Sequence, residues 1–219
     1  MPAVTHVVLL GDSVFDNEAY VGAGPEVLRQ TREALPPGSR ATLVARDGAV
    51  IAGIASQIAS LPADATHLVL SVGGNDALQS SGILADASRS VADTLHKLAE
   101  IRHSFAQGYG AMLDRLLALD RPLAVCTIYD PRFAEAEQRR IAAAALTLLN
   151  DAIMREAFVR SLTVLDLRLI CNEDADFANA IEPSARGGEK IARAIARFAA
   201  GKSADAQVIS RAVSDIDHN

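Results

Sequence analysis

Apolar runs alternate with stretches of helical periodicity along most of the chain, and this alternation predicts a parallel sheet covered by helices on both faces. The first run, residues 7–10, stops abruptly at Gly11-Asp12-Ser13, as a buried strand does where it reaches the edge of a sheet. The expected strands cover residues 7–10, 41–45, 67–72, 123–128 and 163–166. The expected helices cover residues 24–35, 51–61, 84–119, 134–160 and 183–199. The pattern therefore predicts an α/β fold, a three-layer α/β/α sandwich with five parallel strands.

Two of the expected helices carry an apolar stripe, because their large hydrophobic residues recur every three or four positions. The stripe of the first helix consists of Val91, Leu95, Leu98, Ile101 and Phe105. The stripe of the second consists of Ile141, Ala145, Leu148, Leu149 and Ile153. Gly108-Tyr109-Gly110 predicts either a kink in the first helix or its division into two.

Length and charge narrow the classes of function. The 219 residues suit one domain, expected over residues 1–201, followed by a polar tail over residues 202–219. The net charge of −6 gives no electrostatic reason to expect nucleic acid or an anionic membrane as a partner.

The chain shows neither a secretory-signal pattern nor an apolar run long enough to span a bilayer, so we expect a cytoplasmic protein. The two cysteines are too few for a disulfide scaffold.

Polar and glycine-rich segments stand where expected strands end or where the last helix begins. They are Gly11-Asp12-Ser13, Asp47-Gly48, Gly73-Gly74-Asn75-Asp76 and Glu182-Pro183-Ser184. Acyl transfer needs a hydroxyl nucleophile, a base to take its proton and donors for the developing oxyanion. Ser13 offers the hydroxyl, and the backbone N–H groups of Ser13 and Gly48 with the side-chain amide of Asn75 offer the donors. Gly-Asp-Ser alone is equally typical of an ordinary strand-to-helix turn.

These segments resemble the sequence blocks of the GDSL esterase/lipase, or SGNH hydrolase, family. The first block reads Gly11-Asp12-Ser13-Val14, with Val in place of the usual Leu, and the third, Gly-x-Asn-Asp, is matched in full from Gly73 to Asp76. The glycine of the second block corresponds best to Gly48. The resemblance implies a flavodoxin-like fold, Ser13 as the nucleophile, and Gly48 with Asn75 in the oxyanion hole.

The last block departs from the family pattern. The family has Asp-x-x-His before a Pro and a Gly, whereas this chain has Asn179 and Glu182 at those two positions. A carboxylate is a weaker base than imidazole near neutral pH, but burial raises the pKa of a carboxyl group. Two interpretations of Glu182 therefore stay open: a catalytic base for Ser13, or a negative charge that caps the last helix.

The histidines of the chain offer no obvious replacement for the missing base. His6 and His67 stand at the starts of their strands, and seven residues of strand span about 23 Å, so both are expected to be structural. His96 and His103 are expected to face solvent on one side of a helix. His218 falls in the expected tail, and the sequence does not exclude it.

The sequence thus predicts a serine esterase that cleaves a small or short-chain acyl ester through an acyl-serine intermediate, with Ser13, Gly48, Asn75 and Glu182 as catalytic residues. The same residues would serve acyl transfer to an acceptor other than water. Few aromatic residues and the lack of an apolar lid segment argue against long-chain lipids. We expect no metal and no cofactor. The alternative is a catalytically silent domain that binds a carboxylate, an acetyl group or a sugar.

Overall fold

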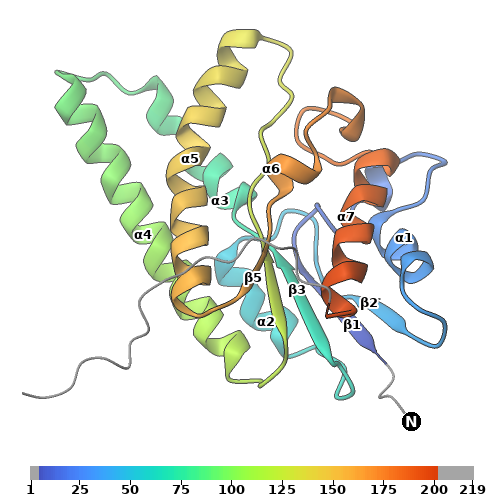
Figure 1. Cartoon of the computed structure of the whole chain (residues 1–219). Coiled ribbons are helices and arrows are strands. Elements are labelled where there is room, and N and C mark those ends of the chain that lie inside the picture. The colour runs from blue at the N-terminus through green and yellow to red at the C-terminus, as the bar shows by residue number, and fades with distance from the viewer. Residues whose placement is uncertain (1–4, 202–219) are drawn as a thin grey trace, which may run out of the picture.

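Five parallel strands form one sheet in the order β2-β1-β3-β4-β5 (Figure 1). The computed structural model describes residues 5–201. The strands are β1 (His6–Gly11), β2 (Arg40–Leu43), β3 (His67–Ser71), β4 (Leu123–Cys126) and β5 (Thr163–Leu165). Strand order changes direction between β1 and β3, and sheets of this flavodoxin-like order bind ligands beyond the carboxyl ends of those two strands. The predicted three-layer sandwich is confirmed.

Helices cover both faces of the sheet (Figure 1). On one face lie α1 (Val27–Ala34), α6 (Leu167–Ile170) and α7 (Ala185–Ala199), and on the other α2 (Ile54–Ile58), α4 (Val91–Leu117) and α5 (Ala136–Val159). Between these elements lie α3 (Gly74–Ser80) and the 3-10 turns η1 (Glu18–Tyr20), η2 (Ile51–Gly53), η3 (Ser81–Ala85) and η4 (Asp174–Asp176). Within the described residues, no helix combines the length and the apolarity needed to cross a bilayer.

Strand β1 holds the centre of the molecule, because its side chains alternate between two hydrophobic cores. Val8 and Leu10 join the core under α2, α4 and α5, whereas Val7 and Leu9 join the core under α1 and α7. All four side chains are fully buried. A strand buried on both faces is apolar throughout, which explains the uninterrupted run seen in the sequence. Its carboxyl end therefore delivers the following residues to a fixed place at the edge of the sheet.

Sequence and structure differ most between β3 and β4. The predicted helix over residues 84–119 begins only at Val91, and the sequence did not predict α3 or η3 ahead of it. Helix α4 runs unbroken through Gly108-Tyr109-Gly110, so these residues do not divide it, and the predicted kink stays a prediction. A β-carbon at Gly110 would lie 2.7 Å from Oε2 of Glu156, so this glycine lets α5 approach α4. The predicted tail, with His218, lies outside the described residues.

The end of β1 depends on a glycine. Gly11 has a φ of +124°, and a β-carbon there would lie 1.7 Å from the carbonyl oxygen of Ser71 on β3. The N–H of Asp12 donates to that same oxygen at 3.0 Å. The side-chain amide of Gln57 clamps Gly11 from the other side, with hydrogen bonds of 2.7 and 2.8 Å to its N–H and carbonyl groups. Only glycine combines this φ with so close a backbone contact, and the direction of Asp12 and Ser13 follows from it.

We expect Gly11→Ala to lower the free energy of unfolding by at least about 3 kcal/mol, because the added methyl must displace β1 from β3. Gly38→Ala is the matched control: Gly38 also has a positive φ, +85°, but nothing lies within 4 Å of the position that an added methyl group would take. It should lose only about 1 kcal/mol, the cost of the left-handed backbone. Urea denaturation of both variants measures the difference, and equal losses would contradict the role given to the Ser71 contact.

Candidate active site

Ser13 and Glu182 meet at the carboxyl edge of the sheet although they are 169 residues apart in the chain. The hydroxyl of Ser13 donates to Oε1 of Glu182 at 3.1 Å, and both residues are buried. A second hydrogen bond joins the same two segments: Asn17 donates from Nδ2 to the carbonyl of Pro183 at 3.2 Å. The fold therefore brings together the predicted nucleophile and the predicted base.

A tight turn before α7 fixes the backbone of Glu182. Asn179 accepts the N–H groups of Ile181 and Glu182 on Oδ1, each at 2.9 Å, and the N–H of Ala178 donates to the carbonyl of Glu182 at 2.8 Å. The hydroxyl of Tyr129, in the loop after β4, donates to the carbonyl of Ile181. Asn179, at the position of the family's Asp, thus orders the turn and places Glu182 rather than contacting its carboxylate.

Glu182 is not the residue that caps α7. The N-cap of α7 is Ser184, whose Oγ accepts the N–H of Gly187 at 3.2 Å. Glu182 lies two residues earlier, and its carboxylate contacts Ser13 instead. A serine that can serve as the N-cap leaves the glutamate free for another role.

The Gly-x-Asn-Asp segment begins α3 and holds the loop that follows β2. Asn75 donates from Nδ2 to the carbonyl of Ala49 at 3.0 Å. Asp76 accepts the N–H of Ile51 on both carboxylate oxygens, at 3.2 and 3.3 Å. These bonds tie to α3 the loop that contains Gly48, whose φ is +75°. The two predicted oxyanion donors, Gly48 and Asn75, therefore belong to one connected unit.

Several donors at this edge have no acceptor among the described residues. In the part of the chain that the structure describes, neither the N–H of Ser13 nor that of Gly48 makes a hydrogen bond. Asn75 uses one of its two amide hydrogens for Ala49, which leaves the other one available. Ser13, Asn75 and Glu182 all line one cavity, and Gly48 lies outside this lining.

Burial changes the acidity of two carboxyl groups beside Ser13. Burial of Glu182, together with the charge of Asp47, outweighs the hydrogen bond from Ser13 and raises the pKa of Glu182 to about 7. Its second oxygen, Oε2, is buried with no hydrogen-bond partner among the described residues, which further disfavours the charged form. Burial raises the pKa of Asp12 to about 8, although the N–H of Val14 donates to Oδ1 of Asp12 at 3.2 Å. Near neutral pH, Glu182 is poised between its two states and Asp12 is mostly neutral.

The histidines in the described residues lie away from this edge, as the sequence predicts. His6 is buried, with Nδ1 3.0 Å from Asp64 and Nε2 2.8 Å from Thr42, and its pKa is lowered by burial. The ring of His67 packs edge-on against Phe198. His96 and His103 are exposed on α4. Among residues 5–201 no group of three His, Cys, Asp or Glu side chains is placed to hold a metal ion.

Comparison with solved structures shows which known proteins share this fold. No family model and no curated protein matches the sequence. Among solved structures, phospholipase A1 from Streptomyces albidoflavus is 17% identical, with a TM-score of 0.63 over 92% of this chain and 100% of that one. The chain has the fold of the SGNH hydrolases.

Two further structures with this fold carry different descriptions. A carbohydrate acetylesterase from Sinorhizobium meliloti is 12% identical, with a TM-score of 0.62 over 90% of this chain and 99% of that one. A member of the lipolytic G-D-S-L family from Veillonella parvula is 15% identical, with a TM-score of 0.60 over 88% of this chain and 97% of that one. At these identities the likeness establishes the fold, so chemistry must be argued from the residues of the site.

Sequence reasoning missed three features of the site. It did not predict the shifted pKa of Asp12, the contact of Tyr129 with the turn before α7, or a cavity beside Ser13. Asp12 and Tyr129 each follow the end of a strand, and this position in the sequence could have marked them as site residues. The cavity depends on how far two helices stand apart, and helical periodicity carries no such information.

The raised pKa values predict that stability falls as pH rises. The folded state favours the protonated forms of Asp12 and Glu182, so their contribution is complete below about pH 4 and is lost as pH rises through about 7 and 8. Each unit of pKa shift corresponds to about 1.4 kcal/mol. Asp12→Asn keeps an acceptor for Val14 and cannot ionise, so the variant should lose less stability than the wild type between pH 4.5 and 8.

Urea denaturation across that pH range tests this expectation. Glu182→Gln should also reduce the loss of unfolding free energy between pH 4.5 and 8. Asp86→Asn is the control, since the side chain of Asp86 is 56% exposed. Identical slopes for Asp12→Asn and the wild type would show that Asp12 is ionised in the folded protein throughout.

Proposed function

We propose that this protein is a divergent member of the SGNH hydrolases and cleaves carboxylic esters with Ser13 as the nucleophile and Glu182 as its base. The observation that carries the proposal is the buried hydrogen bond from the hydroxyl of Ser13 to Oε1 of Glu182, at the wall of a cavity. A nucleophile within hydrogen-bond reach of a base is the arrangement that covalent catalysis needs. The ester-hydrolysing descriptions of structures with the same fold support the same reaction class.

In the first half of the reaction, Oγ of Ser13 attacks the ester carbonyl and its proton passes to Oε1 of Glu182. The N–H of Ser13, the free amide hydrogen of Asn75 and the N–H of Gly48 are the proposed donors to the oxyanion. Collapse of the tetrahedral intermediate breaks the ester C–O bond, and Glu182 returns the proton to the departing alcohol. The acyl group stays on Ser13.

In the second half, Glu182 takes a proton from water while the water oxygen attacks the acyl-serine carbonyl. The Ser13 C–O bond then breaks, the carboxylic acid leaves, and the proton returns from Glu182 to Ser13. An alcohol in place of water would give acyl transfer through the same steps. Only one acid–base group is required, because each proton that Glu182 accepts is returned within the same half-reaction.

The environment of Glu182 compensates for the absence of histidine. A carboxylate with an ordinary pKa near 4.3 is a weak base, and efficient proton transfer needs a pKa near the working pH. Burial brings the pKa of Glu182 to about 7, in the range of a free imidazole. The turn ordered by Asn179 then does what the family's Asp is expected to do, which is to hold the base in place.

The alternative of a catalytically silent binding domain remains a prediction, and one observation opposes part of it. The carboxyl side chains that line the cavity are Asp12, Glu137 and Glu182, and among the described residues no Lys, Arg or His joins them. A bound carboxylate would therefore find no cationic partner, and Glu137 and the ionised form of Glu182 would repel it. An acetyl group or a sugar is neutral and is not opposed by this argument. The cytoplasmic location also stays a prediction.

We expect purified protein to hydrolyse p-nitrophenyl acetate and butyrate, with kcat/KM rising with pH through about 7 as Glu182 ionises. Ser13→Ala should abolish turnover, and Glu182→Gln should reduce kcat by roughly 10²–10⁴-fold, the usual contribution of a general base. Glu189→Gln, an exposed change on α7, is the control and should behave as wild type. Mass spectrometry of the quenched reaction should show an acyl adduct on Ser13.

Two results would overturn parts of this mechanism separately. Turnover that survives Ser13→Ala excludes the acyl-serine, and full activity of Glu182→Gln excludes the base while leaving the esterase. If the wild type turns over no ester of a broad panel and Glu182→His gains activity, the silent domain becomes the better description.

A further inference from the structure

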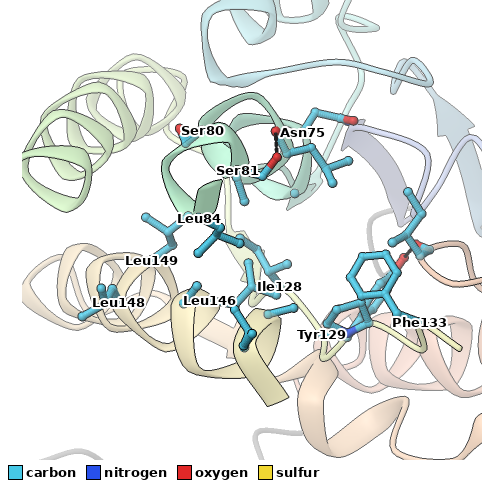
Figure 2. A pocket seen from close by; sticks show the side chains of 18 of the residues that line it. Asn75, Ser80, Ser81, Leu84, Ile128, Tyr129, Phe133, Leu146, Leu148 and Leu149 are labelled. Atoms are coloured by element: carbon cyan, nitrogen blue, oxygen red, sulfur yellow. Dashed lines mark hydrogen bonds between the residues drawn. The ribbon is translucent and has the colours of Figure 1, made fainter. Parts of the chain in front are cut away.

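A cavity of about 790 Å³ opens beside Ser13 and runs between α3 and η3 on one side and α5 on the other (Figure 2). Pockets that enclose organic ligands have volumes of about 300–1,000 Å³, so this one exceeds the needs of an acetyl group by a wide margin. Ser13, Asn75 and Glu182 stand in the same lining. Any group bonded to Ser13 is therefore at the entrance of the cavity.

The inner walls of the cavity are hydrophobic. Figure 2 shows Leu84 of η3 facing Leu149 of α5, with Ile128 of the loop after β4 close to Leu146. Most other lining residues share this character, and the acidic groups are Asp12 and Glu182 beside Ser13 and Glu137 near the start of α5. Among the described residues no lysine, arginine or histidine belongs to the lining, so the cavity favours an uncharged apolar ligand and offers no cation to pair with an anionic one.

The two predicted stripes explain how this space arises. Phe105 and Ile153, toward the carboxyl ends of the stripes, are buried against the sheet. Leu98, Ile101 and Ala145, nearer the amino ends, line the cavity instead. The amino-terminal parts of α4 and α5 thus extend past the sheet (Figure 1). Their hydrophobic residues that lack contact with the sheet line the cavity.

Large hydrophobic residues are also exposed around these parts of α3, η3, α4 and α5. Their exposed fractions are Leu78 44%, Leu84 53%, Val91 77%, Leu95 58% and Ile141 45%. Leu78, Leu84 and Ile141 belong to the cavity lining as well, so the exposed apolar surface is continuous with the cavity. Exposed apolar patches of this kind mark the binding sites of apolar ligands or partners.

We propose that this cavity, built by η3, α4 and α5, holds the hydrocarbon chain of a medium- or long-chain acyl ester. The inference rests on the proposed function and departs from the short acyl chain that the sequence predicts. The acyl group is the part of the ester that stays on Ser13 through both half-reactions, whereas the alcohol must leave before water attacks. The cavity therefore suits the acyl group. The alcohol would leave on the polar side of the site, near Tyr20 and Asp47. The hydroxyl of Tyr20 and the carboxylate of Asp47 are 2.6 Å apart there and exposed.

A series of p-nitrophenyl esters from acetyl to dodecanoyl tests the proposal, below the concentration at which each ester forms micelles. We expect kcat/KM to rise roughly threefold for each added methylene up to octanoyl, the increase that burial of one methylene provides. Alkyl acetates of increasing alcohol length should show no such rise. A rise along the alkyl acetates alone would place the alcohol in the cavity and overturn the assignment to the acyl chain.

A matched pair of variants on adjacent positions of α5 locates the effect. Ala145 lines the cavity, and Ala144 faces solvent. Ala145→Trp should lower the octanoyl-to-acetyl ratio of kcat/KM at least tenfold, because the indole fills the space the chain would occupy. Ala144→Trp should leave the ratio unchanged. Equal ratios in Ala145→Trp and the wild type would overturn the proposal, and circular dichroism confirms that both variants fold.

Binding of neutral alcohols separates this inference from the proposed function. Decanol should raise the melting temperature of Ser13→Ala more than butanol does at equal concentration, and Ala145→Trp should abolish the difference. If decanol binds but no ester is turned over, the cavity assignment stands and the esterase fails. If acetyl and butanoyl esters are cleaved but neither octanoyl esters nor decanol show a preference, the esterase stands and the acyl cavity fails.

Discussion

A buried carboxylate is the constraint around which the carboxyl edge of this sheet is arranged. Removing Glu182 from water costs free energy that one hydrogen bond from a serine hydroxyl cannot offset. The turn before α7 must therefore be rigid on its own account, and Asn179, Tyr129 and Asn17 each supply a hydrogen bond to its backbone. These hydrogen bonds hold the main chain on both sides of Glu182 and so place its side chain beside Ser13.

A protein can obtain a base with a pKa near neutrality in two ways. Histidine has that pKa in water and needs a partner mainly to orient its ring. A glutamate reaches it only by partial loss of its hydration, and burial of this kind also stabilises the protonated form at rest. When glutamate is the base, its acidity thus depends on the packing of its surroundings. Loosening the turn before α7 would lower the pKa of Glu182 and also displace its carboxylate oxygen from Ser13.

The elements that the sequence could predict are those fixed by local pattern. Apolar runs of strand length located all five strands, and the turn residues after them located Ser13 and Asn75. The role of Glu182 could not be decided from sequence, because helix capping and catalysis favour the same residue type at the same place. The structure shows that Ser184 is the N-cap of α7, and the catalytic role of Glu182 stays a proposal. Periodicity predicted the buried positions Phe105 and Ile153, but Val91, Leu95 and Ile141 of the same stripes are exposed. A stripe has the same spacing in sequence whether it meets the sheet, a cavity or solvent.

The hydrogen bonds from Asn75 to Ala49 and from Asp76 to Ile51 have one more consequence. They connect the end of β3 to the loop after β2, and α3 itself forms part of the cavity wall. The rest of the wall comes from η3, α4 and α5, which lie further along the chain than Asn75 and Asp76. Substitutions along α4 and α5 can reshape the cavity while the geometry around Ser13 is preserved, which gives one scaffold the freedom to change its ligand without rebuilding its chemistry.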